Sequence, residues 1–322
     1  MSSTNIWVLG DNRVGNTNQA IALADSLSTD YEVKNIKYNL LGLLPNFMLM
    51  LYPWHVERHF IKALEDSAAP KLIISSGRRT ASISMYLKKK FKDTKFVQIL
   101  NPEGNISKFD LVILPEHDSC CEYSANIIRT IGAFNKIHIE KNKQSIDFHR
   151  YYPDAKNFIA VIIGGDNKKA KFKIEDAENL KDILLKITKN HPIPLFFSFS
   201  RRTPEKLREM IKSNFLWPHI IYDPLEGGYN PYLDMLKEAD YIICTGDSIS
   251  MCSEAAASGI PLYIYGPTST KLRKHKFFVQ ELVDLGIARK LDANTNRLEK
   301  YDYNSLNEAV EIAKLIKRQL LL

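Results

Sequence analysis

The chain lacks several features that would assign it to a common class of protein. Its 322 residues include four cysteines (Cys120, Cys121, Cys244 and Cys252), and no two have the two-residue spacing of a structural zinc site. No apolar run is long enough to span a bilayer, and no cleavable apolar segment precedes the first predicted strand. There is no Asp-x-Asp pair for a divalent ion, no sequence repeat and no low-complexity tract. We therefore expect reduced thiols, no metal and a cytoplasmic location.

The charge balance is only modestly positive. Lys and Arg number 44 against 37 Asp and Glu, which leaves a net charge of +7, and hydrophobic residues make up 45% of the chain. This composition is typical of a globular protein with room for two domains. The charge suits an anionic ligand such as a nucleotide, or a negatively charged membrane surface, and does not require nucleic acid.

Short apolar runs alternate with amphipathic stretches, which predicts α/β units with parallel sheets. In the first half we expect strands over 6–10, 32–36, 72–75, 96–100 and 111–114, and helices over 17–27, 55–64, 80–91 and 122–127. The polar stretch 140–155 is interpreted as an interdomain linker. In the second half we expect strands over 158–163, 195–200, 220–222, 241–244 and 262–264, and helices over 174–188, 204–213, 231–238, 252–258, 272–285 and 305–321. Two similar halves predict a cleft between two sheet edges.

The most informative stretch runs from residue 241 to 264. A buried strand leads into Thr245-Gly246-Asp247-Ser248, and a helix rich in small residues follows. Such a loop presents backbone N–H groups at the carboxyl edge of a sheet, an arrangement that binds phosphate. Glu254 lies in the first turn of that helix, from which it can reach a sugar hydroxyl.

Other predicted strands end in polar loops of the same kind. The loop from Gly10 to Gln19 carries Asp11, Gly15, Asn18 and Gln19, although the alternative is a polar turn capped by Asn or Thr. Paired arginines follow two further strands, as Gly77-Arg78-Arg79 and as Ser200-Arg201-Arg202, where they can bind phosphate or carboxylate. For the arginines the alternative is an exposed helix start with one surface salt bridge.

Three more loops contain candidate ligand-binding groups. Gly164-Gly165-Asp166-Asn167-Lys168-Lys169 offers backbone access and positive charge, and Asn230-Pro231-Tyr232 opens a helix beside tyrosines that can stack on a base or sugar. After another strand, His117 is a candidate general base, with Asp118 as its alternative, whereas a lone loop histidine is more often structural. Gln98, at the end of a strand, is expected to line the same cleft.

The segment Leu40–Trp54 is the most apolar part of the chain. It is too short to span a membrane and Pro45 interrupts it. One interpretation is a buried core segment. The other is an exposed apolar lip that rests on a membrane or holds a lipid-linked substrate, which would make the protein peripheral at the inner membrane.

These motifs, in order and over nearly the whole chain, resemble the elongated-mitochondria family of fission proteins, which has many bacterial members. The stretches that carry the resemblance are Gly77-Arg78-Arg79-Thr80-Ala81, Val97-Gln98-Ile99 with Asn101-Pro102, Pro115 with His117-Asp118, Thr130 with Gly132-Ala133, Ile163-Gly164-Gly165, Ser200-Arg201-Arg202-Thr203, Asn230-Pro231-Tyr232, and Thr245 with Asp247-Ser248, Ser250-Met251 and Ser253-Glu254-Ala255. Plant members are linked to mitochondrial fission at the outer organelle surface.

The second half is also similar to GT-B glycosyltransferases, in particular the peptidoglycan enzyme that uses a lipid-linked acceptor. The matching residues are Ser250, Met251, Ser253, Glu254, Gly259 and Pro261. The resemblance implies two Rossmann-like domains, over 1–150 and 151–302, with residues 303–322 returning to the first. It also implies that backbone near Ser250 and Met251 holds the donor diphosphate, that Glu254 binds the ribose, and that the Gly164-Gly165 loop faces the donor.

Together these features predict a metal-independent enzyme that transfers a sugar from a nucleotide-diphosphate donor to a hydroxyl. Asp11, His117 or Asp118 would be the base, because Asn16 stands where family members typically carry histidine. Arg201 and the start of the helix at Ser250 would stabilise the leaving diphosphate. The alternatives are a non-catalytic adaptor that recruits a membrane-remodelling partner, which Asn16 favours, and a nucleotide-sugar epimerase.

Overall fold

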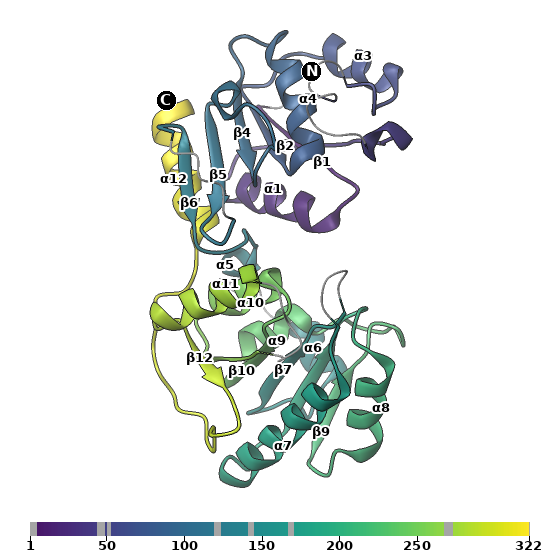
Figure 1. Ribbon diagram of the computed structural model, residues 1–322, viewed down its shortest axis with the longest axis vertical. Coiled ribbons are helices and arrows are strands. Elements are labelled where there is room, and N and C mark those ends of the chain that lie inside the picture. The colour runs from purple at the N-terminus through teal and green to yellow at the C-terminus, as the bar shows by residue number, and fades with distance from the viewer. Residues whose placement is uncertain are drawn as a thin grey trace. The chain divides into compact units, whose positions relative to one another are not determined.

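A computed structural model describes residues 5–43, 49, 53–118, 124–140, 145–166, 171–266 and 273–321 (Figure 1). The chain divides into two compact units, Met1–Asn135 with Asn307–Leu322, and Lys136–Leu306. Each unit contains a six-stranded sheet in which every neighbouring pair of strands is parallel. The prediction of two Rossmann-like α/β domains with a GT-B-like fold is confirmed.

The first unit has the strand order β2-β1-β3-β4-β5-β6. Its strands are β1 (Ile6–Gly10), β2 (Tyr31–Asn35), β3 (Leu72–Ser76), β4 (Lys95–Ile99), β5 (Leu111–Pro115) and β6 (Ile127–Thr130). Its helices are α1 (Val14–Ser26), η1 (Leu40–Leu43), α3 (Arg58–Asp66), α4 (Arg78–Lys88), η2 (Ile106–Lys108), α12 (Glu308–Ile316) and the π-helical turn η3 (Lys317–Leu321). The order reverses between β1 and β3, so the loops that follow these two strands meet at a switch point, where α/β sheets bind ligands.

The C-terminal helix returns to the first unit, as the GT-B resemblance predicts. Ala309, Ile312 and Ile316 of α12 are buried in one cluster with Ala20 and Leu23 of α1. These residues recur at the three- and four-residue spacing of one helix face, and their burial holds the end of the chain on the first sheet.

The second unit has the strand order β12-β11-β10-β7-β8-β9. Its strands are β7 (Ile159–Ile163), β8 (Leu195–Phe199), β9 (His219–Tyr222), β10 (Tyr241–Thr245), β11 (Leu262–Tyr265) and β12 (Ala288–Leu291). Its helices are α5 (Ile137–Glu140), α6 (Ile146–Tyr151), α7 (Ile174–Asn190), α8 (Glu205–Asn214), α9 (Tyr232–Glu238), α10 (Ile249–Ala257) and α11 (Arg273–Asp284). Here the order reverses between β10 and β7, which brings the loops after those strands together.

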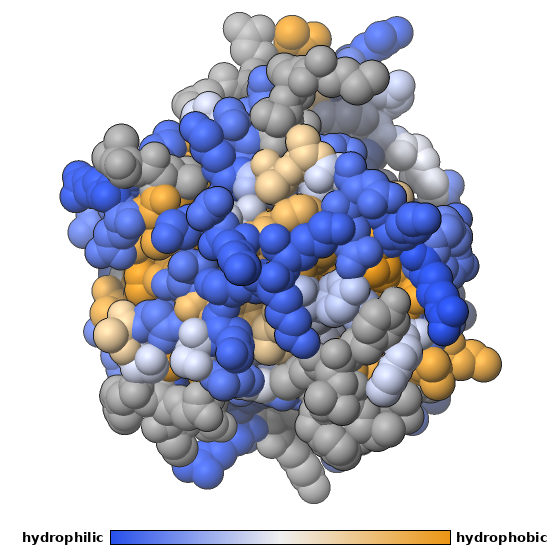
Figure 2. Space-filling view, turned by 90° about the horizontal axis from the view of Figure 1, so that it is seen from above, coloured by the Kyte–Doolittle hydropathy of each residue, from blue (hydrophilic) through white to orange (hydrophobic). Residues whose placement is uncertain are grey.

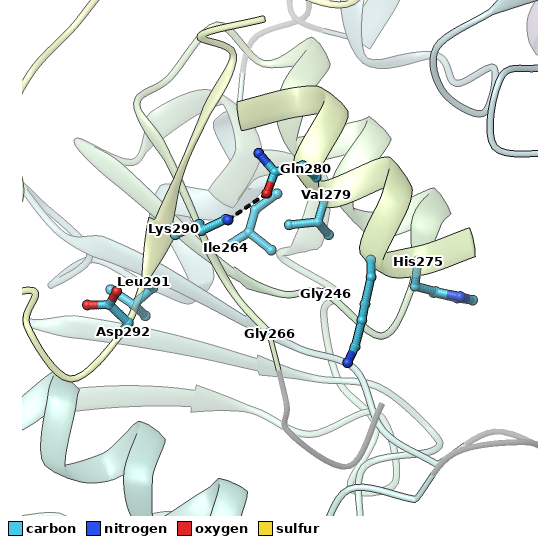
Figure 3. A pocket seen from close by; sticks show the side chains of 10 residues that line it. Gly246, Ile264, Gly266, His275, Val279, Gln280, Lys290, Leu291 and Asp292 are labelled. Carbon is cyan, nitrogen blue, oxygen red and sulfur yellow. Dashed lines mark hydrogen bonds between the residues drawn. The ribbon is translucent and has the colours of Figure 1, made fainter. Parts of the chain in front are cut away.

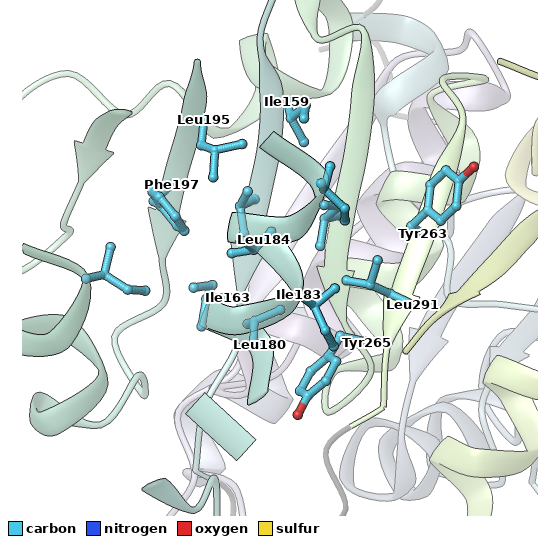
Figure 4. Packing of buried hydrophobic residues seen from close by; sticks show 14 of the residues in the cluster. Ile159, Ile163, Leu180, Ile183, Leu184, Leu195, Phe197, Tyr263, Tyr265 and Leu291 are labelled. Atoms are coloured by element: carbon cyan, nitrogen blue, oxygen red, sulfur yellow. The ribbon is translucent and has the colours of Figure 1, made fainter. Parts of the chain in front are cut away.

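The core of the second unit explains why its central strands were recognisable. Ile159 and Ile163 of β7 pack with Leu180 and Leu184 of α7 and with Phe197 of β8 (Figure 4). All five residues of β7 are buried, as expected of a parallel strand covered by helices on both faces. In the sequence, strands of this kind appear as continuous apolar runs.

Three sequence predictions need correction. The stretch 140–155 is not a linker: α6 lies within it, and Phe148 is fully buried against Phe158 and Phe196. Residues 136–150 and 303–306 belong to the second unit instead of the first. The predicted helix over 122–127 is wrong where the structure describes it, because β6 begins at Ile127 after a turn. Strands β6 and β12 were not predicted.

Figure 2 shows one face of the molecule, on which hydrophobic side chains appear in several places between hydrophilic ones. Among the described residues, no helix is long and apolar enough to cross a bilayer. Of the segment Leu40–Trp54, residues 44–48 and 50–52 lie outside the described part of the chain. At its two ends Leu40 is 87% exposed and Trp54 45% exposed, whereas Leu49 is buried.

Candidate functional site

Three loops meet at the carboxyl edge of the second sheet, after the neighbouring strands β10, β7 and β8. The amide of Gly164 donates to Thr245 Oγ1 (2.8 Å), and the amide of Gly165 donates to Asp247 Oδ2 (2.8 Å). Ser200 Oγ donates to the carbonyl of Gly164 (3.0 Å). The motifs predicted at Gly164-Gly165, Ser200 and Asp247 therefore form one structure in this unit.

Close approach of these loops requires glycine at two positions. A Cβ on Gly164 would overlap the carboxylate of Asp247, and a Cβ on Gly165 would overlap the backbone of Arg202 and Thr203. The loop after β7 therefore packs, with no side chain of its own, on the Asp247 carboxylate and on the backbone of the loop after β8.

Asp247 has a mixed environment. Burial raises the pKa of its carboxyl, while hydrogen bonds from Thr245 and the Gly165 amide and the charge of Arg202 oppose that rise. Its Oδ1 atom is buried and accepts no hydrogen bond. Arg201 and Arg202 are exposed beside it, so the edge of the sheet carries both positive side chains and an unsatisfied buried oxygen.

The start of α10 completes this edge. Its N-cap residue Ser248 makes no side-chain capping bond, and the first backbone bond of the helix runs from the Cys252 amide to the Ser248 carbonyl. In the described part of the chain, the amides of Ile249, Ser250 and Met251 have no backbone or side-chain acceptor. Free amides at the positive end of a helix dipole form an anion-binding site.

Glu254 lies on the same helix and is held in place by Tyr232. The hydroxyl of Tyr232 donates to Glu254 Oε2 (2.5 Å), and the Tyr232 amide donates to Asn230 Oδ1 (3.1 Å). Burial raises the pKa of the Glu254 carboxyl, and the bond from Tyr232 opposes that rise. Within the predicted Asn230-Pro231-Tyr232 motif, Asn230 therefore holds the backbone of Tyr232, and the hydroxyl of Tyr232 holds Glu254.

A cavity of about 540 Å³ adjoins the loop at Gly246 (Figure 3). It lies between α11 and the ends of β10, β11 and β12, with Ile264 and Val279 in its wall. Lys290 donates to Gln280 (2.5 Å) across it. His275 also lines it, and burial lowers the pKa of that histidine. The volume is in the range of small-molecule sites.

The loop after β8 is anchored by Arg208, a residue that the sequence analysis did not select. Its side chain is 1% exposed. It donates to the carbonyls of Ser200 (2.6 Å) and Thr203 (2.9 Å) and forms an ion pair with Asp223. Although burial opposes it, the hydrogen bonds from Arg208, Lys212 and the Leu225 amide and the charge of Arg208 lower the pKa of the Asp223 carboxyl to about 2. Arg208 therefore fixes the backbone between Ser200 and Thr203.

The first unit has its own polar site at its switch point. Asp11 follows β1, and its Oδ2 accepts from Asn16 Nδ2 (3.2 Å). Arg79, which follows β3, lies 3.9 Å from Asp11 Oδ1 and donates to Asn12 Oδ1 (2.9 Å). The two predicted loops thus do come together. Asn16 orients Asp11 there.

Other predicted residues of the first unit occupy different environments. Gln98 is fully buried and bonds Ser75 and the carbonyls of Gly77, Ile99 and Leu100, so the expectation that it lines a cleft is not met. Gln19 is also buried, whereas Gly15 and Asn18 are exposed on α1. The side chain of Arg78 lies 3.9 Å from the carboxylate of Glu103.

The candidate bases His117 and Asp118 lie after β5, where Arg129 donates to the Asp118 carbonyl (3.1 Å). Lys168, Lys169, Cys120 and Cys121 lie outside the described residues.

Gly77 gives a direct test of this switch point. Its φ is +81°, and a Cβ there would overlap the side-chain amide of Asn16. We expect Gly77→Ala to lower the free energy of unfolding by about 1–3 kcal/mol, because both the backbone and the neighbour oppose a side chain. The measurement is urea unfolding. Gly15→Ala is the control, since no atom lies within 4 Å of its added Cβ, and equal stabilities of the two variants would contradict the prediction.

Comparison with known proteins shows which protein families and which solved structures this chain is similar to. A family model described as mitochondrial fission ELM1 matches residues 14–320. An uncharacterised protein of Rickettsia prowazekii, RP120, is 44% identical over 97% of this chain and 98% of its own length. The mitochondrial fission protein ELM1 of Arabidopsis thaliana is 26% identical over 79% of this chain and 65% of its own length.

Two solved structures share the fold at low sequence identity. The UDP-GlcNAc 2-epimerase of Methanocaldococcus jannaschii, in complex with UDP-GlcNAc and UDP, has a TM-score of 0.53 at 14% identity and covers 97% of this chain and 99% of its own. The glycosyltransferase of kitacinnamycin has a TM-score of 0.54 at 11% identity and covers 99% of this chain and 100% of its own. At these identities the likeness establishes the architecture alone.

Proposed function

We propose, from the premise that this chain belongs to the mitochondrial fission ELM1 family, that it is a glycosyltransferase of the GT-B type. In this proposal the second unit binds a nucleotide-diphosphate sugar, and the protein transfers the sugar to a hydroxyl of an acceptor. UDP-GlcNAc is the first donor to test, because a protein of the same fold was solved in complex with it.

The observation that carries the proposal is the joined edge of β10, β7 and β8. Glycine backbone at Gly164 and Gly165 lies beside the uncapped start of α10, and Glu254 is one turn further along that helix. The free amides and the helix dipole at the start of α10 suit a diphosphate, and a carboxylate accepts hydrogen bonds from the paired hydroxyls of a ribose. The cavity beside Gly246 has room for the sugar or the base.

The same groups support the chemistry of transfer. When the bond between the sugar and the diphosphate breaks, negative charge develops on the leaving phosphate. The N-terminus of α10 and the exposed guanidinium groups of Arg201 and Arg202 stabilise that charge. Removal of one such donor typically costs about 2.7–4 kcal/mol of transition-state stabilisation. In this proposal these residues replace a bridging metal, and no cofactor is needed besides the donor.

The acceptor side of the proposal assigns the first unit. Asp11, His117 and Asp118 are the candidate bases there. Leu40 and Trp54 are exposed apolar side chains of the same unit, which suits a lipid-linked or envelope acceptor at a membrane surface. An acceptor of this kind would make the protein peripheral at the inner membrane.

Glu254→Gln tests the donor site. We expect the substitution to weaken UDP-GlcNAc binding at least 10-fold, because a hydrogen bond to a charged group contributes about 1.5–3 kcal/mol. The measurement is the ligand-dependent shift of the unfolding temperature, which follows occupancy. Glu299→Gln is the matched control, since that carboxylate lies on the surface and pairs with Arg289 and Arg297.

Two outcomes would count against the proposal. If none of a panel of nucleotide sugars raises the unfolding temperature of the wild type, the proposed donor site fails and the non-catalytic adaptor becomes the favoured alternative. If Glu254→Gln and Glu299→Gln respond equally to UDP-GlcNAc, Glu254 does not bind the ribose. Mass spectrometry of the wild type with a bound donor and envelope lipids separates a transferase from an epimerase, because an epimerase leaves the acceptor unchanged.

A further inference from the structure

Among the buried polar atoms of the first unit that have no hydrogen-bond partner, four belong to side chains that lie together. The atoms are Asp11 Oδ1, Tyr38 Oη, His55 Nδ1 and Arg79 Nε. Buried polar atoms are nearly always paired, so several unpaired ones in a small region need an explanation. Each unsatisfied buried polar group costs folding free energy, and a ligand that pairs these atoms would recover that cost.

The four side chains form one continuous group. The rings of His55 and Tyr38 are stacked, with centroids 5.6 Å apart and an interplanar angle of 10°. The guanidinium of Arg79 lies over the Tyr38 ring, 5.3 Å from its centroid, and reaches to 3.9 Å from Asp11 Oδ1. The side chains of Asp11, Tyr38 and Arg79 therefore lie together beside the switch point of the first sheet, where α/β folds bind ligands.

The chemistry of these atoms selects one kind of group. Asp11 Oδ1 accepts a hydrogen bond, Arg79 Nε donates one, and Tyr38 Oη does either. An anionic group would be repelled by the Asp11 carboxylate, and a cation by the Arg79 guanidinium. A neutral hydroxyl both donates and accepts, so it satisfies the set without an uncompensated charge.

We propose that Asp11, Tyr38 and Arg79 bind a neutral hydroxyl of the acceptor, and that Asp11 accepts its proton. This inference rests on the proposed transferase function. The acceptor oxygen bonds to the anomeric carbon, the bond from that carbon to the diphosphate oxygen breaks with its electron pair leaving on the diphosphate, and the hydroxyl proton passes to Asp11 Oδ1. The acceptor is thus an alcohol or a sugar, and not a phosphate or an amine.

Asn16 and His55 are positioning residues in this site. Asn16 donates to Asp11 Oδ2, which leaves Oδ1 for the hydroxyl. His55 is fully buried and contacts Ser82 Oγ through Nε2 (3.1 Å), which fixes the ring against which Tyr38 stacks. Burial lowers the pKa of His55, so it supports Tyr38 as a neutral ring.

The first arm of the test is a crystal structure of the full chain with glycerol as the hydroxyl probe. We expect a glycerol or water oxygen within hydrogen-bond distance of both Asp11 Oδ1 and Tyr38 Oη. A structure in which those two atoms bond each other, or in which the site is dry, would overturn the inference. This arm does not depend on the donor.

The second arm measures UDP release from UDP-GlcNAc with water or glycerol as the acceptor. We expect Asp11→Asn to slow release roughly 100-fold, the low end of what a general base contributes, and Tyr38→Phe to slow it about 10-fold, the loss of one hydrogen bond. Tyr31→Phe is the matched control, since its hydroxyl bonds Asp25 instead (2.7 Å), and it should leave release unchanged. All three variants should keep the donor-dependent shift in unfolding temperature.

The outcomes separate the two proposals. If no nucleotide sugar binds, the proposed function fails, and the crystal arm alone decides whether a hydroxyl site exists. If UDP-GlcNAc binds but the wild type releases no UDP, or if Asp11→Asn releases it at the wild-type rate, the inference fails while donor binding stands.

Discussion

Replacing Arg208 with alanine is expected to lower the free energy of unfolding by about 3–5 kcal/mol, the cost of breaking a buried ion pair from one side. Arg208 is almost completely buried, and its guanidinium bonds Asp223 and the carbonyls of Ser200 and Thr203. Alanine leaves the buried carboxylate with Lys212 as its remaining cation and leaves two carbonyls unpaired. The loop that meets Gly164 then loses its anchor, so UDP-GlcNAc binding should weaken as well.

Thermal and urea unfolding measure this effect. For a unit of this size, each kcal/mol shifts the midpoint by about 2–4 °C, so a fall of roughly 6–20 °C is expected. Lys212→Met is the matched control. Its ammonium also pairs with Asp223 (2.7 Å) but is partly exposed, and exposed pairs contribute about 0–1 kcal/mol. Equal losses for the two variants would contradict the buried-anchor role of Arg208.

The pH dependence of the Arg208→Ala effect has a definite sign. The folded-state pKa of Asp223 is lowered from 3.8 to about 2. A lowered carboxyl pKa stabilises the fold above the unfolded-state value, and that stabilisation is lost as the pH falls through the folded-state value. The difference between wild type and Arg208→Ala should therefore be full at neutral pH and shrink between about pH 4 and pH 2. A constant difference over that range would show that the ion pair is not its source.

The strands buried on both faces could be predicted from the sequence, and so could the edge strands β2 and β9, although none of their residues is buried. Ile159–Ile163 and Leu111–Pro115 are continuous apolar runs with every residue buried. Strand β12 was missed because its two central residues, Arg289 and Lys290, are charged and not buried. Two adjacent charged residues interrupt the apolar run or the alternation that would predict a strand.

The linker error has a related cause. Residues 140–155 are polar overall, and the buried side chains among the described ones are those of Ser145, Phe148 and Ala155. So few buried side chains, at irregular spacing, give no periodicity that sequence analysis can detect. The role of Phe148 is visible only in the structure, where the rings of Phe158 and Phe196 pack against it.

The residues of the candidate site also divide into those that could be predicted from the sequence and those that could not. The loops at Gly164, Ser200 and Asp247 were recognisable because each pairs an apolar strand with glycine or hydroxyl residues, a local pattern. Tyr38 and His55 were not, because they reach Asp11 and Arg79 only through tertiary contacts across different elements. Arg208 lies in the charged helix Glu205–Asn214, where the sequence suggests a solvated face. Burial alone distinguishes it from its neighbours.

Substituting Gly165 with alanine should remove the nucleotide response and lower the free energy of unfolding by about 1–3 kcal/mol, the usual cost of overpacking. An added Cβ would overlap the carbonyl of Arg202 and come within 2.6 Å of the Thr203 amide nitrogen. Both are backbone atoms, so no side-chain rotation relieves the overlap. The loops after β7 and β8 must therefore move apart. This movement displaces the Gly165 amide and weakens its hydrogen bond to Asp247 Oδ2.

The control is Gly266→Ala, in the same unit, where no atom lies within 4 Å of the added Cβ. Its stability should change by less than about 0.5 kcal/mol, as for surface substitutions in general. The two variants are compared by urea unfolding, and Gly165→Ala is also titrated with UDP-GlcNAc. Loss of nucleotide binding at a temperature where Gly165→Ala is still folded would locate the diphosphate at the joined loops, because the substitution displaces backbone there and removes no ligand-binding side chain. Undiminished binding in a destabilised Gly165→Ala would instead place the ligand away from this edge of the sheet.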